Sequence, residues 1–117
     1  MTIISSHTLN GLNGSHAGAI PVSLKKTNES KNIFDTFMDN GGRLNEYVPI
    51  ENNDENAIYE LVFKTGDYWK NIINDENYQN IVQEIVIRFN IPDIKKKYHF
   101  PIILSPHSYS TWWSEGE

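Results

Sequence analysis

Residues 57–64 read Ala57-Ile58-Tyr59-Glu60-Leu61-Val62-Phe63-Lys64, and every second side chain from Tyr59 to Phe63 is large and apolar. A period of two is typical of a β-strand with one buried face, because successive side chains of a strand point to opposite sides of its sheet. We therefore expect Tyr59, Leu61 and Phe63 to enter the core together. The stretch predicts a half-buried strand.

The same alternation recurs in seven other stretches, so the sequence predicts eight strands in all. These stretches are 3–9, 20–24, 33–38, 43–50, 85–91, 98–104 and 109–113. Turn-forming runs separate several of them, such as Asp39-Asn40-Gly41-Gly42, whose residues tolerate the positive φ of a tight hairpin. The polar stretch 51–56 is expected to form a surface loop.

Apolar side chains recur at helical spacing between residues 65 and 77, which predicts one short helix. They are Tyr68, Trp69, Ile72 and Ile73. Thr65 or Asp67 could cap the N-terminus of this helix. Many short strands joined by turns, together with one helix, favour an all-β sandwich over a parallel α/β sheet. We find no linker and no internal repeat, so residues 1–117 are predicted to form a single domain.

Charge and composition exclude several classes of function. Ten Lys and Arg residues stand against fifteen Asp and Glu residues, a net charge of −5, which does not favour binding to nucleic acid. The absence of cysteine excludes disulfides, thiolate zinc sites and a cysteine nucleophile. No apolar run approaches the roughly 20 residues of a membrane helix, and the first residues do not resemble a signal peptide. We expect a cytoplasmic protein; the peroxisome stays open as a compartment, although the last residues carry no peroxisomal signal.

Two histidines interrupt stretches that are otherwise mainly apolar. His7 shares one face of its strand with Ile3 and Leu9, and His99 lies among the apolar residues of 98–104. Taken alone, each is most simply a partly buried histidine held by one hydrogen bond. Neither histidine shows the spacing of a metal-binding pair, so no metal site is expected.

Arg43 follows Gly41-Gly42 at the start of a predicted strand, where its guanidinium group could bind a planar anion through two hydrogen bonds. On spacing alone, the simpler interpretation is a solvated surface arginine. His16 and His107 lie beside Gly or Ser in predicted turns, and we interpret both as surface residues.

Several motifs, taken together, resemble the transthyretin superfamily. They are Ser5-Ser6-His7-Thr8-Leu9-Asn10, Gly14-Ser15-His16-Ala17-Gly18-Ala19-Ile20-Pro21-Val22-Ser23-Leu24, Gly42-Arg43, Tyr98-His99-Phe100-Pro101-Ile102-Ile103-Leu104-Ser105-Pro106 and Tyr109-Ser110-Thr111. Within that superfamily the chain is similar to the 5-hydroxyisourate hydrolase branch. That branch carries a histidine on the first strand, an arginine after a glycine turn, and a second histidine in a Tyr-His-x-Pro strand, a set that hormone-carrying transthyretins lack.

The resemblance implies an eight-stranded β-sandwich with one short helix, assembled as a homotetramer with its sites in a central channel. It implies hydrolytic opening of the six-membered ring of 5-hydroxyisourate, which yields 2-oxo-4-hydroxy-4-carboxy-5-ureidoimidazoline in urate breakdown. No metal or organic cofactor is implied. His7 and His99 would handle protons, and Arg43 would hold the oxygen that gains charge.

The end of the chain departs from the family pattern. The hydrolases typically continue Tyr-Ser-Thr with Tyr-Arg-Gly-Ser, whereas this chain has Trp112-Trp113-Ser114-Glu115, so that Trp113 stands where the family has a second arginine. We expect Ser110, Trp112 and Trp113 to contact the substrate, and the indoles could stack on a flat ring or narrow the cleft. Two alternatives stay open: a transthyretin-like carrier that binds a flat aromatic ligand without catalysis, and a β-sandwich that serves only as an interaction module.

Overall fold

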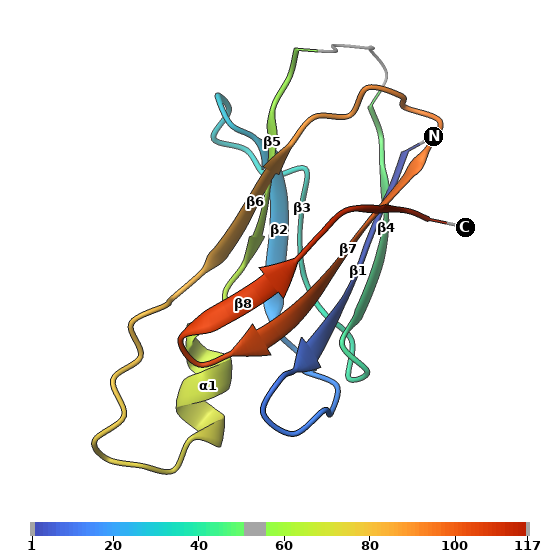
Figure 1. Cartoon of the computed structure of the whole chain (residues 1–117). Coiled ribbons are helices and arrows are strands. Elements are labelled where there is room, and N and C mark those ends of the chain that lie inside the picture. Colours follow the sequence, from blue (N-terminus) through green and yellow to red (C-terminus); the bar gives the residue numbers. More distant parts are fainter. Residues whose placement is uncertain (1, 51–55, 117) are drawn as a thin grey trace.

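Two β-sheets pack face to face over residues 2–50 and 56–116, the parts of the chain that the computed structural model describes (Figure 1). One sheet contains β1 (Thr2–Asn10), β4 (Arg43–Val48), β7 (Lys97–Ser105), β8 (Ser108–Thr111) and β9 (Ser114–Glu115). The other contains β2 (Pro21–Lys26), β3 (Phe34–Phe37), β5 (Tyr59–Phe63) and β6 (Ile85–Phe89), and α1 (Gly66–Ile72) follows β5. The strand orders are β4-β1-β7-β8, with β9 also paired to β7, and β3-β2-β5-β6. The predicted all-β sandwich with one short helix is confirmed.

The last predicted strand is divided in two. Thr111 of β8 lies opposite Ile102, and Ser114 of β9 lies opposite His99, so both pieces follow one antiparallel register along β7. The interruption falls opposite Phe100 and Pro101, and proline has no N–H to donate to a ladder. The missing donor explains why the pairing stops there and resumes two residues later. Most of the predicted 51–56 loop, residues 51–55, lies outside the described residues.

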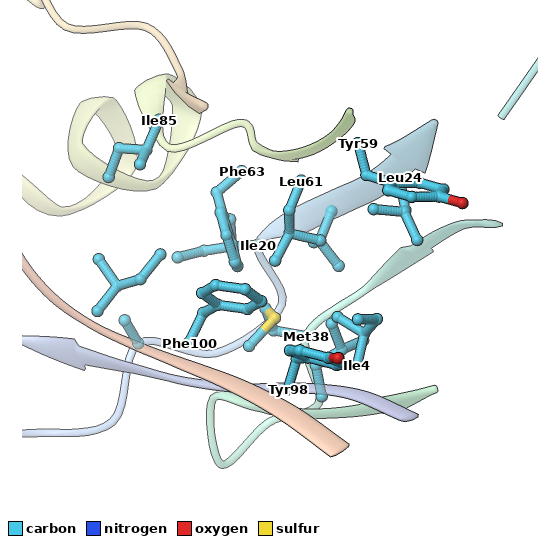
Figure 2. Packing of buried hydrophobic residues seen from close by; sticks show 14 of the residues in the cluster. Ile4, Ile20, Leu24, Met38, Tyr59, Leu61, Phe63, Ile85, Tyr98 and Phe100 are labelled. Carbon is cyan, nitrogen blue, oxygen red and sulfur yellow. The ribbon is translucent and has the colours of Figure 1, made fainter. Parts of the chain in front are cut away.

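The core lies between the two sheets, as Figure 2 shows. Tyr59, Leu61 and Phe63 are at most 1% exposed, which confirms the face predicted from residues 57–64. Tyr98 and Phe100 pack against them from β7. Helix α1 covers the end of the sandwich at which β1 ends (Figure 1).

The helix was predicted in the right place but is shorter than 65–77. Trp69 is buried, whereas Ile72 is 46% exposed, because the backbone becomes extended at Ile73 and the helix ends there. Thr65 occupies the N-cap position, but its side chain makes no capping hydrogen bond. No helix among the described residues is both long enough and apolar enough to cross a membrane.

The core-facing side of β1 is unexpectedly polar. Besides Ile4, the residues that point inward are Thr2, Ser6, Thr8 and Asn10, all buried. Each has a partner: Thr2 Oγ1 donates to the Ile94 carbonyl (2.7 Å), Ser6 Oγ to the Phe100 carbonyl (2.6 Å), Thr8 Oγ1 to the Ala17 carbonyl (2.6 Å), and Asn10 Nδ2 to the Tyr68 hydroxyl (3.0 Å). These bonds offset the cost of burying polar groups, so this face of β1 can face the core. Because side chains alternate along a strand, the opposite face, which carries His7, points out of the sandwich.

Candidate active site

His7 and Arg43 are direct neighbours on the outer face of the larger sheet. His7 of β1 pairs with Arg43 of β4 in an antiparallel ladder, so their side chains project from the same side. Burial lowers the pKa of His7 most, followed by the charge of Arg43 and then by His16. A backbone hydrogen bond with Gly41 raises this pKa, and His99, the smallest of the causes, lowers it. A lowered pKa keeps the imidazole neutral near pH 7, which is the form that accepts a proton.

His99 reaches the same face from the neighbouring strand. β7 runs parallel to β1, with His99 beside Ser5 and Pro101 beside His7. His7 and His99 therefore lie on adjacent strands and are offset by two residues along them. With strands ~4.8 Å apart and a rise of ~3.3 Å per residue, their Cα atoms are about 8 Å apart. The structure brings the three residues predicted for chemistry together on one patch.

The ring of His99 is held by a partner that the sequence analysis did not select. Ser5 is buried, and its Oγ lies 2.8 Å from Nδ1 of His99. This contact orients the ring and leaves Nε2 available to the outer face. Burial, then the charges of Lys97 and Arg43, lower the pKa of His99, so this imidazole is also neutral near pH 7.

The glycine turn before β4 places Arg43 at the site. Gly42 has φ +73°, and a Cβ there would lie 2.5 Å from the Thr8 carbonyl oxygen, so only glycine fits without strain. The Arg43 backbone N–H donates to Oδ1 of Asp39 (2.8 Å), which ties the strand entrance to the turn. The side chain of Arg43 is exposed, and within residues 2–50 and 56–116 no carboxylate forms an ion pair with it. Its charge is available to an anion.

His16 contacts His7, which the sequence analysis did not anticipate. The turn after β1 folds the chain back, so that the Ala17 N–H donates to the Thr8 carbonyl (2.9 Å) and His16 forms a β-bridge with Leu9. Nε2 of His7 lies 2.9 Å from Nδ1 of His16, and the two rings stack. His16 is on the surface, as expected. The sequence signal was the turn-rich segment after Asn10, which returns the chain to its own strand.

The tail residues divide between the two faces of the sheet. Ser110 lies opposite Ile103, and strand alternation places Trp112 on the same outer face. Trp113 lies toward Tyr98: the two ring centroids are 6.3 Å apart, and Trp113, still 52% exposed, helps to line a cavity of about 290 Å³ with Tyr98 and Phe100. The structure thus brings Ser110 and Trp112, but not Trp113, to the face that carries the histidines.

The site is an open face rather than a pocket. A cavity of about 400 Å³ lies elsewhere in the described part of the chain, lined by residues such as Lys26 and Tyr59. No group of three His, Cys, Asp or Glu side chains in the described parts of the chain is placed to bind a metal ion. The chemistry available here is that of two neutral imidazoles and one guanidinium cation.

Comparisons with known proteins identify the family of this chain and agree with its fold. A model of the HIUase/Transthyretin family matches residues 4–113. The 5-hydroxyisourate hydrolase of Halalkalibacterium halodurans is 29% identical over 113 residues, which cover 93% of this chain and 94% of that protein. The structure of Klebsiella pneumoniae 5-hydroxyisourate hydrolase superposes with a TM-score of 0.76 at 22% identity over 100% of both chains. Sea bream transthyretin, solved in complex with thyroxine, gives a TM-score of 0.75 at 19% identity and covers 97% of this chain and 95% of that chain.

Proposed function

This chain belongs to the HIUase/transthyretin family, and we propose that it hydrolyses 5-hydroxyisourate to 2-oxo-4-hydroxy-4-carboxy-5-ureidoimidazoline in urate breakdown. The observation that carries the proposal is the register of β4, β1 and β7. That register gathers Arg43, His7 and His99 on one face, the three side chains on which the resemblance to the hydrolase branch rests.

The two histidines, His7 and His99, carry out the proton transfers of the reaction. Opening a cyclic amide needs a base that activates water and an acid that protonates the leaving nitrogen. His7 and His99 both have a lowered pKa, so each is neutral and able to accept a proton near pH 7. One of them activates water, and the other, once protonated, serves the leaving nitrogen; either assignment fits their positions.

Arg43 stabilises the charge that develops on the carbonyl oxygen. When water attacks, the carbonyl oxygen becomes an anion, and a cation at that point lowers the barrier. The guanidinium group of Arg43 is exposed beside His7 and has no carboxylate partner in the described parts of the chain. It can therefore bind the oxyanion through charge-assisted hydrogen bonds.

The open face supports a further proposal, that the chain works as a homotetramer whose subunits close the site. Tyr47, Ile103 and Trp112 lie on the same outer face as the histidines and are 63%, 39% and 49% exposed. Exposed apolar groups clustered on one face are typical of a protein interface. A second copy packed over this face would turn it into a channel. Light scattering that gives a mass near the 13.5 kDa of one chain would contradict the tetramer.

The function is tested by generating 5-hydroxyisourate in situ with uricase and following its ultraviolet decay with and without the protein. We expect faster decay with the protein, and a loss of about 10²–10⁴-fold in rate for His7→Asn and His99→Asn. His107→Asn is the matched control, because His107 lies in an exposed turn that connects β7 and β8. Folded wild-type protein that leaves the decay unchanged would refute the hydrolase. Binding of a flat aromatic ligand by such an inactive protein would favour the carrier alternative.

A further inference from the structure

His99 contacts a buried serine with one of its ring nitrogens. Ser5 and His99 are paired residues of the parallel strands β1 and β7, and Oγ of Ser5 lies 2.8 Å from Nδ1 of His99. Ser5 is 4% exposed, whereas His99 is half-buried. The other ring nitrogen, Nε2, forms no hydrogen bond within residues 2–50 and 56–116. One side of the ring is thus held by Ser5, and the other is available to a bound molecule.

The hydroxyl group of Ser5 has one hydrogen to donate, and the structure offers it one acceptor. In the described part of the chain, the contact with His99 Nδ1 is the only side-chain hydrogen bond of Ser5. Two arrangements fit the distance: Oγ–H donates to Nδ1, or Nδ1–H donates to Oγ. The second leaves the buried Ser5 hydrogen without an acceptor, and a buried donor without a partner is costly. The first arrangement is therefore favoured.

The direction of this hydrogen bond decides the tautomer of His99. A neutral imidazole carries one N–H and one lone pair, on different nitrogens. Burial, then the charges of Lys97 and Arg43, lower the pKa of His99, so the ring is neutral near pH 7. When Nδ1 accepts the hydrogen of Ser5, the ring hydrogen must lie on Nε2. His99 then presents an N–H, and not a lone pair, to a molecule bound on the outer face.

The groups around this ring favour a donor at Nε2. Lys97 lies two residues before His99 on β7, Arg43 acts from β4, and both add to the effect of burial on the pKa of His99. His7 lies on the intervening strand β1, and Ser114 of β9 is paired with His99 on its other side. No carboxylate in the described part of the chain contributes to this pKa. An N–H and a guanidinium group together suit an oxygen that becomes negative.

We propose that Ser5 holds His99 as a hydrogen-bond donor to the carbonyl oxygen that gains charge, an inference that rests on the proposed hydrolase function. When water attacks the carbonyl carbon, the electron pair of the C=O bond moves onto its oxygen. Nε2–H of His99 and the guanidinium group of Arg43 donate to that oxygen, as in an oxyanion hole. The hydrogen stays on Nε2 while the oxygen gains charge, so this nitrogen is not the base that activates water. Ser5 acts through His99 and is a positioning residue.

Nitrogen-15 NMR of the wild-type protein measures the tautomer directly and requires neither substrate nor a variant that folds. At about pH 8, above the usual pKa of histidine, the nitrogen that carries hydrogen and the nitrogen that carries a lone pair differ in chemical shift. His99→Asn assigns the signals, because those of His99 are missing from its spectrum. We expect the hydrogen on Nε2. A wild-type spectrum with the hydrogen on Nδ1 would overturn the proposal.

Substitutions of Ser5 connect the tautomer to the rate. Ser5→Asp places a carboxylate, which only accepts, beside Nδ1 and moves the ring hydrogen to Nδ1. At about pH 9, where the imidazole stays neutral beside the new charge, we expect kcat to fall roughly 10²–10³-fold, as for the loss of one oxyanion donor, with KM little changed. Ser5→Ala should lose about 2- to 12-fold, the equivalent of one neutral hydrogen bond. Ser5→Thr keeps a hydroxyl group and should retain the wild-type rate.

Ser30→Asp is the matched control for the added charge, because Ser30 is exposed in the connection between β2 and β3; it should keep the wild-type rate. A folded Ser5→Asp variant with an unchanged or higher kcat would show that a lone pair at Nε2 serves the reaction, which overturns the proposal. Equal kcat values in Ser5→Ala and Ser5→Thr would do the same. If wild-type protein leaves 5-hydroxyisourate unchanged, the hydrolase function fails, and the NMR spectrum still decides whether Ser5 sets the tautomer of His99.

Discussion

Replacement of Arg43 by glutamine removes the only charge that the structure places directly opposite His7. The fold should tolerate the change, because the side chain is exposed and the contact with Asp39 is made by the Arg43 backbone. A hydrogen bond to a charged group contributes about 1.5–3 kcal/mol. Since about 1.4 kcal/mol is tenfold, we expect kcat/KM to fall by roughly 10- to 150-fold.

The same change should move the pH profile. Arg43 lowers the pKa of both His7 and His99, so its removal raises both values. Activity depends on neutral imidazole and is lost as the pH falls through these pKa values; the acid limb should therefore begin at higher pH in Arg43→Gln. A single substitution thus predicts two effects, a lower rate and a shifted profile.

The assay measures kcat/KM for uricase-generated 5-hydroxyisourate from pH 5 to 9, with circular dichroism to verify the fold. Arg88→Gln is the matched control, because Arg88 is 70% exposed on the other sheet and lies 3.8 Å from Glu60. The control should keep the wild-type rate and profile. A folded Arg43→Gln variant with an unchanged rate, or with a lower rate and an unmoved acid limb, would refute the role assigned to the guanidinium group.

Two further predictions concern the turn and the tail. Gly42→Ala should lower the free energy of unfolding by roughly 2 kcal/mol or more, because φ is +73° and a Cβ would lie 2.5 Å from the Thr8 carbonyl oxygen. Urea denaturation measures this loss. Gly41→Ala is the control, since a Cβ at Gly41 would meet nothing closer than 3.4 Å. Trp112→Ala should weaken a urate-like inhibitor, whereas Trp113→Ala should leave inhibition unchanged and cost about 0.5–1.5 kcal/mol of stability from its contact with Tyr98. The opposite ranking of inhibition constants would contradict the division of the tail between the two faces.

Local pattern alone determined much of the fold. The alternation in residues 57–64 identified β5 and the buried Tyr59, Leu61 and Phe63, because strand periodicity is a property of neighbouring residues. The glycine turn before Arg43 could also be predicted from the sequence, since a positive φ is favoured by the type of a single residue, glycine. The resemblance of spaced motifs selected His7 and His99, whose position in an apolar stretch would otherwise have been ordinary.

Tertiary structure decided which face of each strand is buried and which side chains meet. On β1 the hydrophobic pattern was ambiguous, and the inward face was settled by hydrogen bonds from Ser6, Thr8 and Asn10 to groups elsewhere in the chain. The contact between His7 and His16 likewise arises only when the turn after β1 folds back. Trp113 contacts Tyr98 because the pairing of β8 and β9 with β7 holds the tail on both sides of it. Such pairings join residues that are far apart in sequence or separated by a turn, so no local pattern contains them.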